Sequence, residues 1–370
     1  MGADDTTGGP VICERYGALV ASVEPPDGAP EIRRRKHSGW RRYAFVAGGA
    51  AIVLVTFAFV LPKIADYRDV WDVVIGLSWQ WVAVLIAATA LNLATFAPTW
   101  MVALPGIGFR QALAMTQAST ALSIVAPGGA AIGMAGSWGM LRGWGFRSTD
   151  VARAVTLTGV WNQLVNLAFP IFALFLLHVD GSQTALLATA AFVGVAVFGV
   201  VVAALALVLY SDNLANDVGD AAAGVVSWIR ARFRREPVGW GGASFTRFRG
   251  DAVDLLARRW YALTLATLAG SLTVFLLLVL SLRAVGVSAS EVDVIEVFAA
   301  WSLMRIIAAV PITPGGFGVV ELGLTTALVA FGGANAEVVA GVLIYRFLTV
   351  VPTLVIGGVS ALMWRSRRAP

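Results

Sequence analysis

The sequence contains few of the residues on which redox and metal chemistry depend. Cys13 is the only cysteine, and the two histidines, His37 and His178, are far apart in the chain. An intramolecular disulfide is therefore impossible, and neither a metal cluster nor a histidine general base is expected. The sequence has no GxxxxGK[ST] loop, which excludes a P-loop as its energy source. We expect no cofactor and no bound metal.

Charged residues are also scarce, and long apolar segments take their place. Charged side chains make up 13% of the chain and hydrophobic ones 58%, whereas soluble domains carry roughly 25% charge. Crossing the hydrocarbon core of a bilayer takes about 20 apolar residues. The sequence therefore predicts an all-α polytopic membrane protein with six full transmembrane helices. The six segments are residues 43–61, 79–97, 151–177, 184–209, 260–282 and 338–363.

The basic residues predict how these spans are oriented. Residues 1–42 lack the short apolar core of a cleaved signal, so we expect a disordered cytosolic tail there. Only Lys63, Arg68 and Arg283 fall in the predicted outward loops, which makes the opposite, basic side cytoplasmic. We expect a multi-pass protein of the bacterial inner (cell) membrane with both termini in the cytoplasm. The net charge of +5 then reflects orientation and anionic lipid, so membrane lipids and not nucleic acid are the expected partners.

Two further apolar segments are each interrupted by a Pro-Gly-Gly sequence. Residues 111–141 are broken at Pro127, Gly128 and Gly129, and residues 295–332 at Pro314, Gly315 and Gly316. Proline removes a backbone donor and glycine permits positive φ, so both sites should end a helix. Each half of about 15 residues gives roughly 22 Å of helix, which is short against a core of about 30 Å. We therefore predict two re-entrant helical hairpins. The alternative is ten full spans, in which the Pro-Gly-Gly turns are ordinary loops.

The order of spans and hairpins predicts an inverted repeat. Residues 43–178 would form the first membrane repeat, with hairpin 111–141 entering from the cytoplasm. Residues 183–363 would form the second, with a cytosolic loop at 211–259 and hairpin 295–332 entering from outside, followed by a cytosolic tail at 364–370. Broken segments at matching positions of inverted halves indicate a transport site at the repeat interface.

The end of the chain carries a family resemblance. The segments PITPGGFGVVELGL and AGVLIYRFLTVVPTLVIGG resemble the closing motifs of a flippase-like family named for the transmembrane region of lysylphosphatidylglycerol synthases. The resemblance covers roughly residues 45–363 and implies movement of aminoacylated or related phospholipid between leaflets. The chain ends just past the last span, without the soluble aminoacyl-transferase domain of the full synthases, so we expect a transporter and not an enzyme. The first half departs from the pattern, since it has no carboxylate where the second has Glu321.

Ionisable residues inside membrane segments cost about 2.5 to 3.5 kcal/mol each on insertion scales, and three of them are candidates for a site. They are Arg305, Glu321 and Arg346. One interpretation is a net positive pocket that binds a lipid phosphate through forked hydrogen bonds. The other is a buried ion pair between Glu321 and one arginine that holds the hairpin in place. The two are compatible, because one arginine can neutralise Glu321 while the other binds the ligand.

The first repeat offers amides in place of charge. Asn162, Gln163 and Asn166 lie in predicted span 151–177, where they could line a polar path or hydrogen-bond neighbouring helices. Together with the three ionisable residues and both Pro-Gly-Gly tips, Asn162 and Gln163 are the predicted substrate-binding residues.

The sequence favours a flippase-like transporter that moves an anionic or aminoacylated phospholipid or a polyprenyl-phosphate lipid. Two alternatives remain at this stage. Inverted repeats with broken helices also occur in ion-coupled transporters of small solutes. A polyprenyl-phosphate-dependent glycosyltransferase would use Asp66, Asp69 or Asp72 in the first outward loop.

Overall fold

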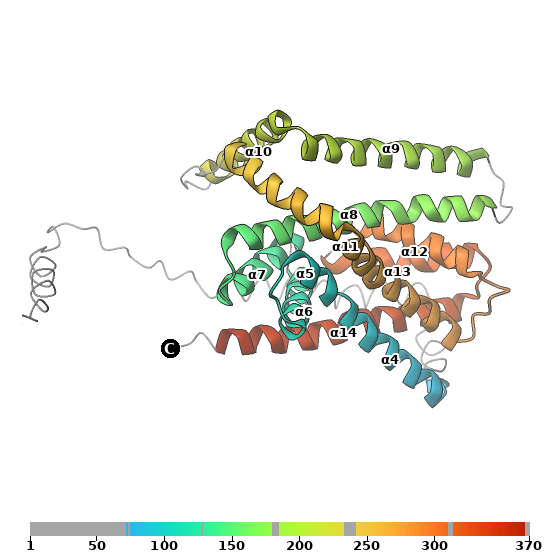
Figure 1. Ribbon diagram of the computed structural model, residues 1–370. Coiled ribbons are helices and arrows are strands. Elements are labelled where there is room, and N and C mark those ends of the chain that lie inside the picture. The colour runs from blue at the N-terminus through green and yellow to red at the C-terminus, as the bar shows by residue number, and fades with distance from the viewer. Residues whose placement is uncertain are drawn as a thin grey trace, which may run out of the picture. The chain divides into compact units, whose positions relative to one another are not determined.

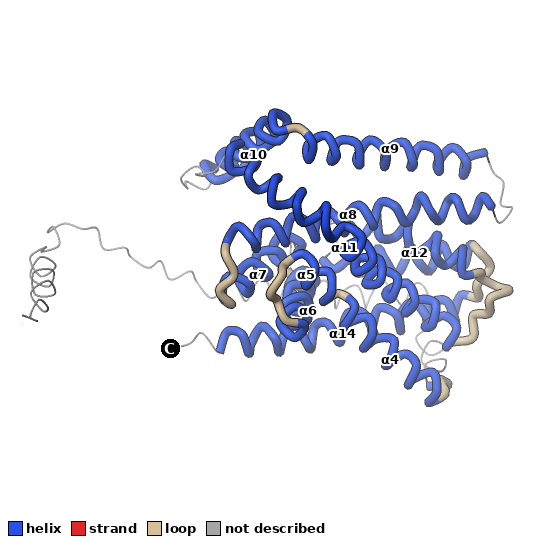
Figure 2. Tube along the Cα trace, viewed as in Figure 1, coloured by secondary structure: helices blue, strands red, loops and turns tan. Residues whose placement is uncertain are grey.

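The chain divides into two units, Met1–Ala44 and Phe45–Pro370. The structure, a computed structural model, describes residues 72, 75–126, 129–179, 185–232, 242–309 and 314–366. The predicted tail at 1–42 and the predicted span at 43–61 lie outside the described residues. Within the described ranges every element is helical, joined by turns (Figures 1 and 2). The predicted all-α class is confirmed.

Five of the predicted spans correspond to long helices. Four helical stretches are long and apolar enough to cross a membrane: Trp79–Ala103, Ser148–Val179, Val253–Ala284 and Asn335–Trp364. They belong to the helices α4 (Trp79–Thr95) with α5 (Ala97–Ala103), α8 (Ser148–Val179), α11 (Gly242–Ala284) and α14 (Asn335–Ser366). The predicted span at 184–209 coincides with α9 (Ala185–Tyr210), which packs beside α8. The multi-pass membrane architecture is therefore confirmed at the level of these helices.

Residues 211–259 were predicted as a cytosolic loop between two spans, and the described part of this connection is helical. It contains α10 (Asp212–Arg232) and the first part of α11, and the two helices pack against each other. Ser211 precedes α10, and its Oγ accepts a hydrogen bond from the backbone N–H of Leu214 at 3.3 Å, which is the bond expected of a helix N-cap. Charge and polarity in this segment predicted exposure, but they do not prevent a helix that has a cap and no interior proline.

Both Pro-Gly-Gly sequences interrupt a helix, as predicted. The first separates α6 (Phe109–Val125) from α7 (Gly129–Gly143). The second lies between α12 (Val294–Ala309) and α13 (Val319–Ala330), with a short 3-10 turn, η3, at Pro314–Gly316. These four helices have 17, 15, 16 and 12 residues. At 1.5 Å per residue they span about 18 to 26 Å, less than a bilayer core of about 30 Å.

The two halves of the chain pack in a reciprocal way. Helix α6 of the first hairpin packs on α14, the last helix of the second half, and α12 of the second hairpin packs on α8, the last helix of the first half. Helix α4 packs on α11, its counterpart in the second half, and η3 contacts α6. Each hairpin therefore rests on the helix that ends the other half, which is the exchange expected of two related halves.

Small residues allow the closest of these contacts. A Cβ on Gly357 of α14 would overlap the backbone carbonyl of Gln117 on α6, so the two helices touch at a point where only glycine fits. Small residues at helix interfaces are typical of membrane proteins, in which close van der Waals packing replaces the hydrophobic effect. This contact sets the first hairpin against α14.

Candidate functional site

The tip of the second hairpin has a backbone that requires glycine. Gly315, Gly316 and Gly318 have φ values of 62°, 69° and 82°. Residues with a side chain rarely adopt this region, so the three glycines allow the chain to turn sharply between α12 and α13. The prediction of positive φ at Gly315 and Gly316 is confirmed. Pro314 begins the 3-10 turn, and its side chain lies outside the described atoms.

Glu321 and Arg346 form a buried ion pair at this tip. The side chain of Glu321, in the first turn of α13, is 3% exposed, and its Oε1 accepts a hydrogen bond from Arg346 Nε at 2.6 Å. Its Oε2 accepts a second bond from the backbone N–H of Gly318 at 2.7 Å. The carboxylate therefore caps α13 at the positive end of the helix dipole while it neutralises the arginine.

Arg346 also holds the turn itself. Its Nη2 donates to the carbonyl oxygen of Gly315 at 2.9 Å, and its Cζ lies 4.9 Å from the ring centroid of Phe317. One guanidinium from α14 thus joins the glycine turn and the start of α13. Of the two interpretations of the buried charge, the structural one describes Glu321 and Arg346.

Arg305 has a different environment, at the contact between α12 and α8. Both Nε, at 2.8 Å, and Nη2 donate to Oδ1 of Asn166, and Nδ2 of Asn166 donates to Oε1 of Gln163 at 3.2 Å. The guanidinium lies over the rings of Trp301 and Phe169, with Cζ 4.9 Å and 5.9 Å from their centroids. Among the described residues, no carboxylate lies within 4 Å of Arg305. An amide and two aromatic faces therefore surround its positive charge, and no carboxylate of the described residues neutralises it.

The two arginines belong to one electrostatic region. The buried ring of Tyr345, next to Arg346 on α14, lies within electrostatic reach of Arg305, Arg346 and Glu321. Two guanidiniums and one carboxylate therefore give this region one excess positive charge. Among the described residues, Glu321 pairs with Arg346 and leaves Arg305 without a carboxylate.

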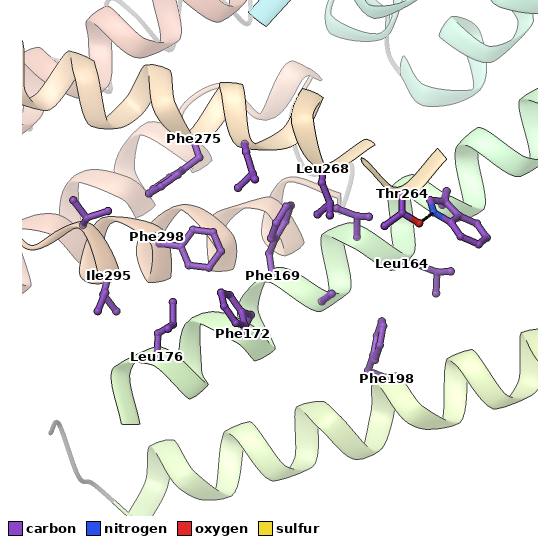
Figure 3. Close-up of a pocket in the computed structure, with 15 residues that line it drawn as sticks. Leu164, Phe169, Phe172, Leu176, Phe198, Thr264, Leu268, Phe275, Ile295 and Phe298 are labelled. Atoms are coloured by element: carbon purple, nitrogen blue, oxygen red, sulfur yellow. Dashed lines mark hydrogen bonds between the residues drawn. The ribbon is translucent and has the colours of Figure 1, made fainter. Parts of the chain in front are cut away.

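An apolar pocket of about 630 Å³ lies beside this region, between α8, α9, α11 and α12. Figure 3 shows Phe169 and Phe172 of α8 together with Phe198, Phe275 and Phe298 of the other three helices around it. The polar groups of Trp161 and Thr264 satisfy each other, because Trp161 Nε1 donates to Thr264 Oγ1 at 2.8 Å (dashed line in Figure 3). The lining therefore offers almost nothing to water and favours hydrocarbon.

The ring of Phe169 marks the boundary between the pocket and the charge. It lines the pocket, packs against Trp301 with centroids 5.2 Å apart, and lies under the guanidinium of Arg305. Hydrocarbon in the pocket and an anion at Arg305 would thus meet across one aromatic ring.

A second cavity, of about 320 Å³, lies on the first-half side and carries more hydroxyl and amide groups than the first, although most of its lining surface is apolar. We call it the hydroxyl chamber. Both helices of the first hairpin line it, together with α5, α8 and α11. Its polar residues are Thr99, Ser119, Thr120, Ser123, Ser137, Thr158, Asn162 and Thr267. Among the described residues that line it, none is ionisable.

The structure separates the predicted site residues into groups. Arg346, Glu321 and the Gly315–Gly316 turn come together, whereas Arg305 pairs with Asn166, which Gln163 supports. Asn162 lines the hydroxyl chamber.

In the first hairpin, Pro127 and Gly128 lie outside the described residues, while Gly129 is described. A Cβ on Gly129 would overlap the carbonyl of Ser123, so its role is close packing of α7 on α6.

Ser123 of the first hairpin is a residue that the sequence analysis missed. Ser119 and Ser123 are four residues apart on α6, and both face the chamber. Their i, i+4 spacing was a readable signal, since such residues share a helix face. The signal was weak, because serine and threonine inside membrane helices commonly bond their own backbone, as Ser123 Oγ does to the Ser119 carbonyl at 2.9 Å.

The chain matches a known protein family. The model of the lysylphosphatidylglycerol synthase TM region matches residues 46–357, which is most of the chain. No curated protein matches the chain at a significant level. The matched range includes every residue of the ion pair, of the Arg305 cluster and of both cavities.

Proposed function

We propose, since this chain belongs to the family of the lysylphosphatidylglycerol synthase transmembrane region, that it is a flippase-like transporter of anionic lipids. Family membership supports a lipid-related role in the membrane. The finer proposal, movement of a phosphate-bearing lipid between leaflets, depends on the surroundings of Arg305.

The single observation that carries the proposal is the partly buried guanidinium of Arg305, which has no carboxylate within 4 Å among the described residues. A charge inside a membrane is costly and normally has a partner or a function. Arg305 Nε and Nη2 are oriented by Asn166, and Nη1 donates to no described residue. The planar fork of arginine matches phosphate oxygens. A lipid phosphate would supply the missing negative charge.

Helix α8 presents two different faces around this anchor. Asn162 and Asn166 are four residues apart and share one face, which runs from the hydroxyl chamber to Arg305. Leu164, Ala168 and Phe172 lie on the adjacent face and line the apolar pocket. An amphiphile with its phosphate at Arg305 would have the hydroxyl chamber for its headgroup and an apolar pocket for a chain.

The hairpins support a passage between leaflets. We propose that both are re-entrant and enter from opposite faces of the membrane, with six full spans and both termini in the cytoplasm of a bacterial cell. The tip of the second hairpin touches the end of α6, because a Cβ on Gly315 would lie 3.2 Å from Ile124 Cγ2. Irregular backbone at membrane depth is stable where protein covers it in this way.

Transport without catalysis fits these residues best. Glu321 is already bound to Arg346 and Gly318, so the buried carboxylate that proton-coupled solute transport would use is engaged. Of the carboxylates that a glycosyltransferase would need, Asp66 and Asp69 lie outside the described residues, and nothing in the described site resembles a catalytic pair. Movement of lipid would run downhill or depend on a gradient.

Reconstitution of the full chain into vesicles tests the proposal. We expect labelled phosphatidylglycerol to redistribute between leaflets with the wild-type protein. Arg305→Gln should slow this by about 10- to 100-fold, since a hydrogen bond to a charged group contributes about 1.5 to 3 kcal/mol. The glutamine can still bond Asn166, so the melting temperature should change little. If the wild-type protein leaves every labelled phospholipid and polyprenyl phosphate where it was, the proposed function is wrong.

A further inference from the structure

The two halves of the chain are related by a constant shift of 187 positions. Helices α8 and α14 have 32 residues each, and α14 begins at Asn335, 187 positions after Ser148, where α8 begins. Pro314 follows Pro127 by the same 187 positions, so the shift also aligns the two Pro-Gly-Gly sequences. Each residue of the second hairpin and of α14 therefore has a counterpart in the first half.

The shift places two uncharged residues where the second half has its ion pair. Glu321 corresponds to Met134 on α7, and Arg346 corresponds to Gly159 on α8. In the second half these positions are joined by the hydrogen bond from Arg346 Nε to Glu321 Oε1 at 2.6 Å. In the first half both positions line the hydroxyl chamber. The chamber therefore lies where the other half has a charged pair.

No described contact replaces the ion pair in the first half. A Cβ on Gly159 would meet nothing within 4 Å, and Met134 is 52% exposed. The hydroxyls of Ser123 and Ser137, which line the chamber from the first hairpin, donate to backbone carbonyls of their own helices. Among the described residues, no hydrogen bond or ion pair joins α7 to α8.

The helices on the two sides of the chamber are attached to different neighbours. Helix α7 packs on α6, which meets α14 at the close contact of Gln117 with Gly357. Helix α8 packs on α9, α11 and α12, and its Asn166 binds Arg305 of α12. The first hairpin is thus held by α14, and α8 is held by α12, with the chamber between them.

We propose that the first hairpin and α8 move against each other during transport, whereas the second hairpin and α14 stay joined. The inference rests on the proposed function, because an amphiphile can pass only if one side of its site opens. Packed interfaces switch between discrete arrangements. The described arrangement, with the chamber present, is one of them, and the approach of α8 to α7 that fills the chamber gives the other.

The missing ion pair can be introduced to test this inference. The double variant Met134→Glu, Gly159→Arg places the charges of the second half on α7 and α8, and both positions have room for them. It should melt at a higher temperature than either single variant, because each charge then has a partner. It should also move labelled phosphatidylglycerol about tenfold more slowly than wild type, which is a usual strength of coupling between residues in contact.

A like-charged pair is the matched control. Met134→Lys, Gly159→Arg fills the chamber with side chains of similar length, but the two charges repel each other and cannot link the helices. We expect this variant to move lipid faster than the oppositely charged one and to melt at a lower temperature.

Distances between spin labels on the full chain give a readout that does not depend on transport. In a Cys13→Ser background, which removes the only native cysteine, labels are attached at exposed positions of the paired helices. Trp138→Cys with Thr156→Cys reports on α7 and α8, and Leu322→Cys with Phe347→Cys reports on α13 and α14. We expect two distance populations for the first pair and one for the second. The oppositely charged variant should reduce the first pair to one population.

The outcomes separate this inference from the proposed function. A single distance population between α7 and α8 in wild type, or equal melting temperatures of the oppositely and like-charged variants, would overturn the movement while leaving lipid transport intact. Two populations that the opposite charges merge into one, in a protein that moves no lipid, would support the movement and refute the transport function.

Discussion

The two hairpins have the same outline and are held together by different physics. In the first, α7 approaches α6 so closely that a Cβ on Gly129 or Gly133 would overlap backbone or side-chain atoms of Ser119 and Ser123. In the second, the ion pair of Glu321 and Arg346 joins the turn to α14. The first hairpin therefore depends on shape and the second on charge. The two hairpins thus share an outline without sharing chemistry.

The two hairpins also contribute different chemical groups to the candidate site. The first hairpin lines a chamber with no ionisable residue among its described lining, and the second contains Arg305, which no described carboxylate neutralises. An uncharged and a charged subsite on opposite halves suit a ligand that has both kinds of group. The following experiments test whether the hairpins really differ in this way.

Removal of one partner of the ion pair should have the largest effect. We expect Glu321→Ala to cost about 3 to 5 kcal/mol of unfolding free energy, because it leaves the buried charge of Arg346 without a partner. The loss can be measured as a lower midpoint in unfolding by denaturing detergent. The double variant Glu321→Leu, Arg346→Met removes both charges and should be more stable than either single variant. A single variant as stable as wild type would show that charge does not hold the second hairpin.

A side chain that overfills the glycine contact of the first hairpin should cause the second-largest loss of stability. Gly129→Val places methyl groups against the backbone carbonyl of Ser123, which cannot move aside, and should cost about 1 to 3 kcal/mol. Gly323→Ala in α13 is the counterpart in the second hairpin. Its Cβ would meet only the flexible side chain of Met304, so it should cost less than Gly129→Val in the same unfolding assay. If Gly323→Ala cost more stability than Gly129→Val, close packing would not be what holds the first hairpin together.

A substitution at the contact between α4 and α11 should lower the stability by a smaller amount. Asn92 and Thr95 at the end of α4 both bond the hydroxyl of Thr273 on α11, at 3.0 Å and 2.9 Å. Interhelical hydrogen bonds in membranes contribute about 0.6 kcal/mol on average, so Thr273→Val should lower stability by about 1 kcal/mol. A loss comparable to that of Glu321→Ala would mean that the hairpins are not the dominant stabilising elements.

The smallest expected effect on stability concerns Glu291, a carboxylate outside the membrane. Unlike Glu321, it is exposed to solvent. Glu291 Oε2 accepts a hydrogen bond from the backbone N–H of Ser288 at 2.7 Å. This bond, followed by one from the Ser288 hydroxyl, lowers the pKa of Glu291. A lowered folded-state pKa stabilises the turn above the ordinary value of about 4.3, and the stabilisation is lost as pH falls through the lower value.

The turn at Ser288 should therefore loosen below about pH 4 while the membrane helices stay intact. The change can be measured as the protection factor of the Ser288 amide in hydrogen exchange between pH 6 and pH 3, corrected for the intrinsic exchange rate at each pH. Glu291→Gln should make this protection factor independent of pH. Protection of that amide that is the same in both proteins would contradict the role of the carboxylate.

The spans and the hairpin breaks could be predicted because local composition determines them. Apolar length predicted α4, α8, α9, α11 and α14, and proline with paired glycines predicted both interruptions. The prediction of a cytosolic loop at residues 211–259 said nothing of secondary structure, and the described part of that connection is helical.

The pairing of the buried charges could not be predicted in the same way. The sequence showed that Arg305, Glu321 and Arg346 are buried and left two possible partners for the carboxylate. The partner depends on which helix packs on the hairpin tip, and α14 rather than α12 brings its arginine to Glu321. The role of Asn166 depends likewise on the contact of α8 with α12.

By itself the sequence determined that this chain is an all-α membrane protein with two interrupted segments and an excess of buried positive charge. Such properties depend on residues close together in the chain and on the cost of polar groups in hydrocarbon. Only the tertiary structure decided which arginine pairs with Glu321 and where the two cavities lie. Those features arise where helices distant in sequence meet, and side-chain packing, which no local pattern encodes, selects the partners.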